Sequence, residues 1–180
     1  MKKSINKTTE LDSTRLEIIC SVFNLEVSKG HLKWSVSQIA RDCKISRTLV
    51  YYHFGRTKQE ILLNCLEVLT RELYGLNGVR NDFKKTSLLD SLLSCHDLYS
   101  QVPSYSVFCQ KWARKQSIYR DKYLQLQKIY DEKLKVNFPN STLEQRLSLR
   151  AYFYGLVAAP SFERELITEA LQLLRLGDLK

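Results

Sequence analysis

Two helix-start signals that lie close together constrain this chain more than any other feature of its sequence. Ser35 is followed three residues later by Gln38, and Ser46 directly precedes the segment 47–54. A serine at the N-cap, with glutamine at the third helical position, satisfies backbone N–H groups that the first turn of a helix leaves without partners. The apolar helical pattern of the first segment ends around Cys43. The sequence here predicts two short helices joined by a tight turn, the helix-turn-helix arrangement whose second helix fits the major groove of DNA.

The rest of the chain is also predicted to be helical. Apolar residues recur at helical spacing, and no stretch alternates as a β-strand does. Besides the helix-turn-helix pair, the expected helices cover about residues 13–29, 58–74, 87–100, 104–116, 118–136, 142–159 and 161–177. The expected caps of the fourth, seventh and eighth helices are Thr57 with Glu60 three residues later, Ser117, and Ser141 with Glu144 three residues later. The expected core includes Val50 and Phe54 and a buried stripe of the helix at 58–74, formed by Leu62, Cys65, Leu66, Leu69 and Leu73. The prediction is an all-α fold of about nine helices.

The chain is expected to divide into three parts. Residues 1–10 are polar with three lysines and predict a basic flexible arm. Residues 11–72 contain the helix-turn-helix and a fourth helix that links it to the remainder. Residues 75–86 contain two glycines and two asparagines, and their apolar residues show no clear helical period. Such a segment is typical of a boundary between domains. Residues 73–180 are therefore expected to form a second domain.

Positive charge is concentrated around the helix-turn-helix. The net charge is +9. Residues 1–58 carry 11 Lys and Arg against 5 Asp and Glu, whereas residues 59–180 carry 17 against 14. Taken alone, such an excess is more often a solvated surface than a binding site. Because it coincides with the motif, it indicates contact with DNA phosphates.

Cysteine usage and hydropathy favour the cytoplasm. The five cysteines are an odd number at scattered positions without a C-x-x-C pair, which is typical of reduced thiols rather than of a disulfide framework. The basic start is not followed by an apolar stretch, so no signal peptide is expected. No apolar run reaches the roughly 18–20 residues of a membrane helix. We expect a cytoplasmic protein without a membrane partner.

The motif is more specific than a generic helix-turn-helix. The run Ile45-Ser46-x-x-x-Val50-Tyr51-Tyr52-His53-Phe54, with Ser35-Val36-x-x-Ile39-Ala40 before it and Lys58 after it, resembles the DNA-binding domain of the tetracycline-repressor (TetR/AcrR) family. The resemblance covers about residues 11–72. It implies an N-terminal three-helix helix-turn-helix DNA-binding domain followed by a C-terminal helical bundle. It also implies a sequence-specific transcriptional regulator.

The resemblance carries a set of DNA contacts onto this sequence. It places Arg47, Thr48 and Leu49 at the start of the recognition helix, where base edges are within reach. The other positions that it matches to contacts with the DNA backbone, or to the packing of that helix on the DNA, are Ser35, Ser37, Ser46, Tyr51, Tyr52, His53, Arg56 and Lys58.

Several positions depart from the family's pattern, Thr48 and Leu49 among them. Lys44 stands in the turn where a small residue is usual, so it either takes strained dihedral angles or indicates a turn that is not left-handed. The spacing from Phe54 to Lys58 is one residue longer than the commonest form, which leaves Arg56 as the alternative phosphate ligand. Trp34 replaces a usual threonine, and we expect it to pack between the first two helices.

The second domain is expected to dimerise and to sense a ligand. The resemblance implies a homodimer through the eighth and ninth helices, and hence a near-palindromic operator in double-stranded DNA. A pocket among the fourth to eighth helices would suit a small hydrophobic or aromatic effector. Its expected lining is His96, Tyr105, Phe108, Trp112 and Tyr123. Residue by residue, an aromatic stripe of this kind is more often core.

Other functions have less support in the sequence. The chain has no G-x-S-x-G, H-E-x-x-H, P-loop or G-x-G-x-x-G pattern, so we expect neither an enzyme nor a cofactor. No cysteine or histidine spacing supports a metal site. The main hypothesis is a repressor released by its effector. The alternative is a ligand-independent protein that organises DNA or recruits a partner to it, and the sequence leaves the sign of regulation open.

Overall fold

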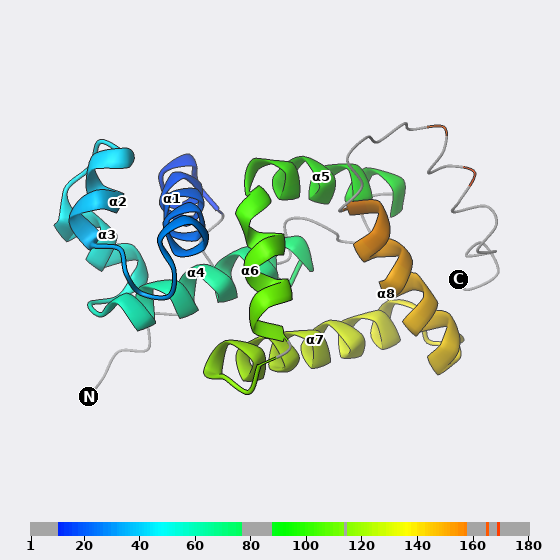
Figure 1. The fold of residues 1–180 in the computed structure, drawn as a ribbon. Coiled ribbons are helices and arrows are strands. Elements are labelled where there is room, and N and C mark those ends of the chain that lie inside the picture. The colour runs from blue at the N-terminus through cyan, green and yellow to red at the C-terminus, as the bar shows by residue number, and fades with distance from the viewer. Residues whose placement is uncertain (1–10, 77–87, 114, 158–164, 166–168, 170–180) are drawn as a thin grey trace, which may run out of the picture.

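The computed structural model describes residues 11–76, 88–113 and 115–157, together with residues 165 and 169. Its helices are α1 (Ser13–Lys29), α2 (Val36–Asp42), α3 (Arg47–Phe54), α4 (Lys58–Leu73), α5 (Leu88–Gln101), α6 (Pro103–Ala113), α7 (Ile118–Asn137) and α8 (Leu143–Val157). All regular structure in this part of the chain is helical, which confirms the all-α prediction (Figure 1). The predicted arm 1–10 and all of the predicted ninth helix except residues 165 and 169 lie outside the described residues.

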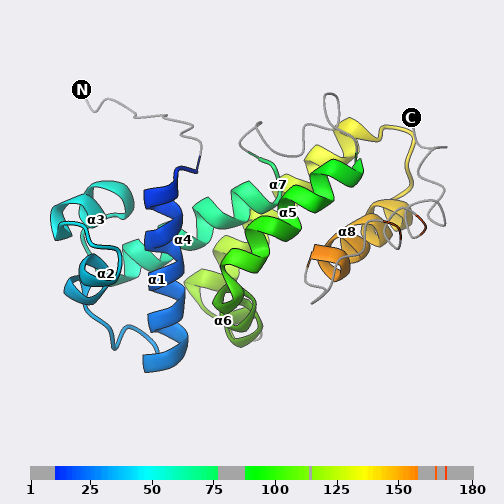
Figure 2. The same ribbon diagram turned by 90° about the horizontal axis from the view of Figure 1, so that it is seen from above.

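The helices form two groups that share α4. Helices α1, α2 and α3 pack together at one end of the molecule, and α5 to α8 lie at the other (Figures 1 and 2). Helix α4 contacts α1 and α3 at one end and α5 and α7 further along. No helix of the described residues is long and apolar enough to cross a membrane.

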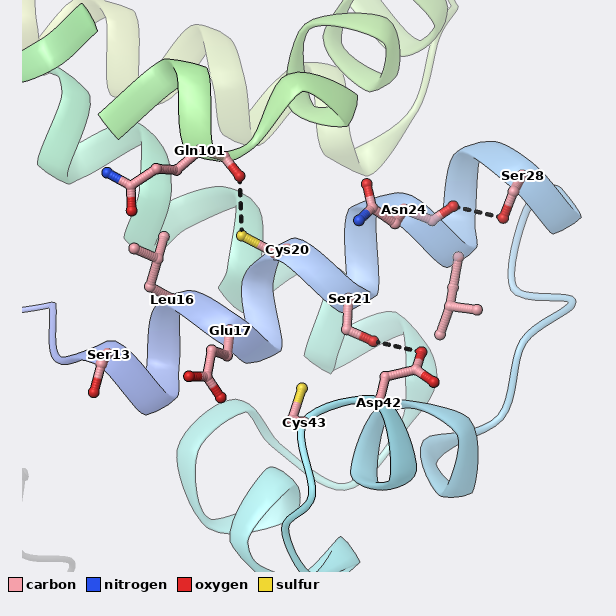
Figure 3. Close-up of a pocket in the computed structure, with 11 residues that line it drawn as sticks. Ser13, Leu16, Glu17, Cys20, Ser21, Asn24, Ser28, Asp42, Cys43 and Gln101 are labelled. Carbon is pink, nitrogen blue, oxygen red and sulfur yellow. Dashed lines mark hydrogen bonds between the residues drawn. The ribbon is translucent and has the colours of Figure 1, made fainter. Parts of the chain in front are cut away.

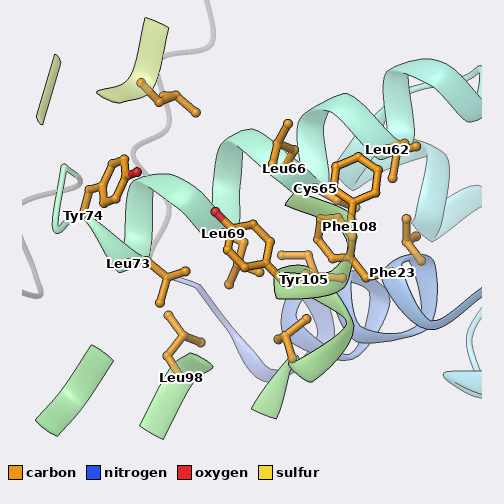
Figure 4. Close-up of a cluster of buried hydrophobic side chains, with 14 of the residues drawn as sticks. Phe23, Leu62, Cys65, Leu66, Leu69, Leu73, Tyr74, Leu98, Tyr105 and Phe108 are labelled. Atoms are coloured by element: carbon orange, nitrogen blue, oxygen red, sulfur yellow. The ribbon is translucent and has the colours of Figure 1, made fainter. Parts of the chain in front are cut away.

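The apolar stripe of α4 lies at the centre of the core. The residues predicted for this stripe are all buried: Leu62, Cys65, Leu66, Leu69 and Leu73. Phe23 of α1 and Phe108 of α6 lie close to it (Figure 4). The ring of Phe23 contacts that of Phe108 at 5.1 Å and that of Tyr105 at 5.6 Å between centroids. These contacts show that α1, α4 and α6 share one apolar region. Each fully buried side chain of this kind contributes about 1.5–3 kcal/mol to the free energy of unfolding.

Local capping signals predicted several helix starts correctly. The Ser35 N–H donates to Gln38 Oε1 at 2.8 Å at the start of α2. At the start of α4, Thr57 Oγ1 accepts from the Glu60 N–H at 3.1 Å, and the Thr57 N–H donates to Glu60 Oε2 at 3.0 Å. Ser117 Oγ accepts from the Arg120 N–H at 3.2 Å at the start of α7.

Two expected starts need correction. Helix α8 is capped by Thr142, not by Ser141, because the Thr142 N–H donates to Gln145 Oε1 at 2.8 Å and Thr142 Oγ1 accepts from the Gln145 N–H at 3.2 Å. The Ser141 hydroxyl instead donates to the Phe138 carbonyl at 2.5 Å. Helix α6 begins at Pro103 itself, since proline fits the first helical position, where no N–H donor is needed.

The turn between α2 and α3 is left-handed at Lys44. Its φ is +54°, so of the two alternatives expected for Lys44, strained dihedral angles in a left-handed turn are the one observed. The Lys44 N–H donates to the Arg41 carbonyl at 3.2 Å, and the Ile45 N–H donates to the Ala40 carbonyl at 2.9 Å. This pair of bonds is the Schellman arrangement, which satisfies the last carbonyls of a helix. It ends α2 and turns the chain into α3.

A buried carboxylate holds the loop between α1 and α2. Glu26 is only 1% exposed. Its Oε2 accepts from Trp34 Nε1 at 2.7 Å and from the Leu32 N–H at 3.0 Å. Its Oε1 lies 2.8 Å from Nδ1 of His31. Trp34 therefore packs against α1, as predicted, and Leu32 is held at a φ of +53°, a conformation that a leucine rarely adopts.

The same loop contacts the second group of helices. The ring of His31 lies 4.5 Å from that of Trp112 in α6 and 5.6 Å from that of Tyr119 in α7, between centroids. These contacts connect the loop before α2 to α6 and α7. The ring contacts of Phe23 with Tyr105 and Phe108 likewise connect α1 to α6. The position of the α2–α3 pair is thus fixed partly by helices that come much later in the chain.

Candidate nucleic-acid interface

Helix α3 has one buried face and one exposed face. Val50 and Phe54 are fully buried, as predicted. Arg47 and Thr48, in the first turn, are exposed, and Leu49 is half-buried. The first turn is therefore presented to solvent by a helix that is anchored on its other side.

The aromatic run at the end of α3 is divided in the same way. Tyr52 is 76% exposed and Tyr51 is 38% exposed. His53 is half-buried, and its ring lies 5.2 Å from that of Tyr52. Burial is the main cause that lowers the pKa of His53. The neutral form of the ring is therefore favoured, and this form can still donate a hydrogen bond to a phosphate.

The serines of the interface are exposed at the first turns of α2 and α3. Ser35 and Ser37 lie at the start of α2. Ser46 caps α3, and its Oγ accepts from the Leu49 N–H at 3.2 Å. Because a hydroxyl can accept and donate at once, Ser46 keeps its own O–H for a phosphate oxygen.

A tight junction joins α3 to α4 at Gly55. Its φ is +105°, and a Cβ at this position would lie 2.9 Å from the Cβ of Glu60. Glu60 Oε2 accepts from the Arg56 N–H at 2.9 Å and from the Thr57 N–H at 3.0 Å, and these bonds lower the pKa of Glu60. The side chain of Arg56 is exposed beside this junction.

Lys58 is exposed, but its ammonium group is already in use. Lys58 Nζ donates to the Leu32 carbonyl at 3.0 Å. An ammonium group has three donors, so two remain for a phosphate. The sequence indicated Lys58 as a DNA contact and gave no signal of this link to the loop before α2.

The structure adds exposed cations that the predicted list of contacts did not contain. Lys44 lies in the turn between α2 and α3, and Arg41 lies in the last turn of α2. The charge excess of residues 1–58 was the only signal for them. Together with Arg47 and Arg56, they are exposed positive side chains of the α2–α3 pair and the junction after it.

The predicted ligand residues fall into three places. Tyr105 and Tyr123 line a cavity of about 160 Å³ among α4 to α8. Aromatic residues form most of its lining, which consists of Leu73, Tyr74, Tyr99, Tyr105, Ser106, Cys109, Gln110, Tyr123, Phe153 and Tyr154. Phe108 and Trp112 line a much smaller void beside it, of about 10 Å³. His96 lies on α5 near Asp97 and is not among the lining residues of either.

A larger groove of about 710 Å³ runs along α1 where it faces the end of α2 and the end of α5 (Figure 3). Cys20 and Cys43 line it together with Glu17 and Asp42. Cys20 Sγ donates to the Gln101 carbonyl at 3.3 Å. Burial raises the pKa of both thiols, that of Cys43 to about 11, so they are protonated at neutral pH. All five cysteines are free in the structure.

No group of three or more histidine, cysteine or acidic side chains among the described residues could hold a metal ion. The chain matches no family model, no curated protein and no solved structure with which it was compared.

Proposed function

We propose that this protein is a sequence-specific DNA-binding transcriptional regulator of the TetR/AcrR type, in which α3 reads the major groove. The division of α3 into two faces carries this proposal. Val50 and Phe54 anchor the helix in the core, whereas Arg47, Thr48 and Tyr52 face solvent. A recognition helix needs this arrangement, because its N-terminal residues must reach base edges while the rest of the domain holds it rigidly.

The first turn of α3 supplies the base contacts in this proposal. Arg47 has a planar guanidinium group that can donate two hydrogen bonds to O6 and N7 of guanine, and Thr48 and Leu49 offer methyl groups to thymine. The phosphate contacts come from the hydroxyls of Ser37 and Ser46 and from the cations around the junction. The N-terminus of α4, after Thr57, adds backbone N–H groups and the positive end of a helix dipole.

Arg47 and Lys58 are expected to respond differently to truncation. Arg47→Ala should remove about 1–3 kcal/mol of discrimination at particular base pairs. Lys58→Ala should weaken binding to all sequences and reduce the salt slope of log K by about one, because one phosphate contact releases about one counterion. The measurement is a salt titration of binding to the operator and to single-base variants of it. Equal, sequence-independent losses for both variants would contradict a base contact by Arg47.

The Lys58 variant needs a structural control, because its ammonium also binds the Leu32 carbonyl. Lys58→Arg keeps the charge and a donor to that carbonyl. It should therefore retain the salt slope. Thermal unfolding of both variants separates a loss of folded protein from a loss of phosphate binding.

We further propose a homodimer that involves α8. Leu143 is 63% exposed and Leu147 is 41% exposed. Ala151 and Gly155, which continue the same stripe at intervals of four residues, are also exposed, and a Cβ at Gly155 would meet nothing within 4 Å. Apolar and small residues on one helix face allow another helix to approach closely. A two-fold dimer would place two copies of α3 about one turn of DNA apart.

A charge on this stripe is expected to separate the dimer without unfolding the subunit. Leu147→Glu should shift the protein from dimer to monomer at micromolar concentration, because the carboxylate would be buried without a partner at the interface. In the isolated subunit this position is exposed, so the change in stability should be within about 0.5 kcal/mol. Gln145→Glu adds the same charge at another exposed position of α8 and should leave the dimer intact. Light scattering measures both, and a monomeric unmodified protein would contradict the proposed dimer.

Regulation completes the proposal. The cavity among α4 to α8 supports a repressor that a small hydrophobic or aromatic effector releases from DNA. Because α4 continues from this cavity to the junction with α3, a ligand that changes the packing of α4 can change the position of the reading helix. A ligand and DNA that favour different arrangements of the subunits weaken each other's binding.

Selection of binding sites from a random pool of double-stranded DNA tests the function. At near-physiological salt, we expect enrichment of a near-palindromic sequence with two half-sites about one helical turn apart. Salt-sensitive binding without enrichment would contradict sequence-specific regulation and favour a protein that organises DNA or recruits a partner.

A further inference from the structure

The size of the cavity among α4 to α8 restricts what it can hold. Its volume is about 160 Å³. An apolar protein cavity of about 150 Å³ is large enough for benzene. The cavity therefore corresponds to one aromatic ring with a small substituent.

The lining excludes charged molecules. None of the ten lining residues is Asp, Glu, Lys, Arg or His. Burial raises the pKa of Tyr99, Tyr105, Tyr123 and Tyr154, and it raises that of Cys109 to about 12. These groups all stay neutral at physiological pH. A charged ligand would lose its hydration and gain no opposite charge, which is costly.

Most phenol groups of the lining already bond to protein. Tyr105 Oη lies 2.8 Å from Thr70 Oγ1, and Tyr123 Oη donates to Tyr154 Oη at 3.2 Å. The side chain of Ser106 beside Tyr99 partly offsets the effect of burial on the pKa of Tyr99. These groups hold the wall of the cavity in place.

Tyr74 differs from its neighbours. Its side chain is 1% exposed, and its ring stacks on that of Tyr130 at 4.6 Å between centroids, with 17° between the planes. Its hydroxyl is buried and has no hydrogen-bond partner among the described residues. A buried hydroxyl is normally paired, so one without a partner requires an explanation. The hydroxyl itself is covered in this structure. Because Tyr74 lines the cavity, a small rotation of its ring would let a ligand supply the acceptor.

We infer that this cavity binds a neutral molecule with a single aromatic ring and one hydrogen-bond acceptor, which the Tyr74 hydroxyl recognises. The inference rests on the proposed function only where it identifies this molecule as the effector that releases DNA. Binding itself depends on the cavity alone.

Four probes of similar size test the inference: acetophenone, ethylbenzene, benzoate and benzylammonium. Their binding to the full-length protein at pH 7 is measured by ligand-observed NMR. Acetophenone should bind about 3- to 10-fold more tightly than ethylbenzene, which has no acceptor, because it forms one additional buried hydrogen bond. The two ions should bind at least about tenfold more weakly than acetophenone.

Two matched variants locate the recognised atom. Tyr74→Phe removes only the hydroxyl, so it should reduce acetophenone to the affinity of ethylbenzene and leave ethylbenzene unchanged. Tyr119 also has a buried hydroxyl without a partner among the described residues, but it does not line this cavity. Tyr119→Phe should therefore leave the binding of all four probes unchanged.

Three results would overturn the inference: no binding of acetophenone, equal binding of an ionic probe, or an unchanged ratio of acetophenone to ethylbenzene in Tyr74→Phe. Each can occur while the DNA selection still yields an operator, and then only the inference fails. Selective binding of acetophenone without an enriched DNA sequence would leave the ligand site in place and contradict the proposed regulator.

Discussion

Replacing Glu26 with alanine is expected to lower the free energy of unfolding by about 2–4 kcal/mol. The substitution would leave the indole N–H of Trp34 and the backbone N–H of Leu32 without their acceptor. The Trp34 side chain is buried, so solvent cannot replace the lost bond to its indole. The loss would also release Leu32 from its left-handed conformation. Chemical denaturation at constant pH measures the change.

Glu26→Gln separates the hydrogen bonds from the charge. Its amide oxygen can accept from Trp34 or Leu32, and its NH₂ can donate to Nδ1 of His31 in the tautomer that accepts. We expect a cost of about 1 kcal/mol, clearly smaller than that of alanine. Equal losses for the two variants would show that the negative charge of Glu26, rather than its pattern of acceptors, stabilises the loop.

Replacing Gly55 with alanine is expected to cost about 2–4 kcal/mol and to weaken DNA binding. Two effects add at this position. An L-residue at φ +105° is strained by about 1–3 kcal/mol, and the new Cβ would approach the Cβ of Glu60 to 2.9 Å, which forces the chain to shift. The shift would separate the end of α3 from the start of α4, and so displace the proposed reading helix. Denaturation and operator binding of the same variant measure both consequences.

Gly30 provides a matched control. Its backbone is similar to that of Gly55, with φ +93° and ψ 172° against φ +105° and ψ 179°. A Cβ at Gly30, however, would meet only the flexible Lys33 side chain, at 3.7 Å. Gly30→Ala therefore carries the backbone strain alone. If Gly55→Ala cost no more than Gly30→Ala, the contact with Glu60 would not contribute.

The elements that the sequence predicted well are those set by local chemistry. The span 13–29, the Thr57 and Glu60 box and the Ser117 cap depend on residues within one or two turns of a helix. Val50 and Phe54 were also predicted as core from the helical pattern. The error at the start of α8 arose because Ser141 and Thr142 are adjacent hydroxyl residues. Only the contact between Ser141 and the Phe138 carbonyl decides between them.

Residues whose role depends on distant parts of the chain were not predictable in this way. In the sequence, Glu26 cannot be distinguished from a solvated acid on an amphipathic helix. Its role depends on the hydrogen bond from the Trp34 indole, which forms only in the folded chain. Tyr74, directly after α4, and Tyr154 of α8 line the cavity from parts of the chain far apart in sequence. No sequence spacing indicates that they lie together. Phe108 and Trp112 share a helix face with Tyr105, but that face is divided between two voids.

The contacts of α1 have a consequence for how the molecule unfolds. The ring of Phe23 rests on α6, and His31 rests on Trp112, so the predicted division near residue 73 separates the sequence but not the apolar core. A fragment that ended at residue 76 would expose these surfaces and lose their stabilisation. We therefore expect the reading helices and the helices around the cavity to form one cooperative unit, with a single calorimetric transition whose enthalpy agrees with its van't Hoff value.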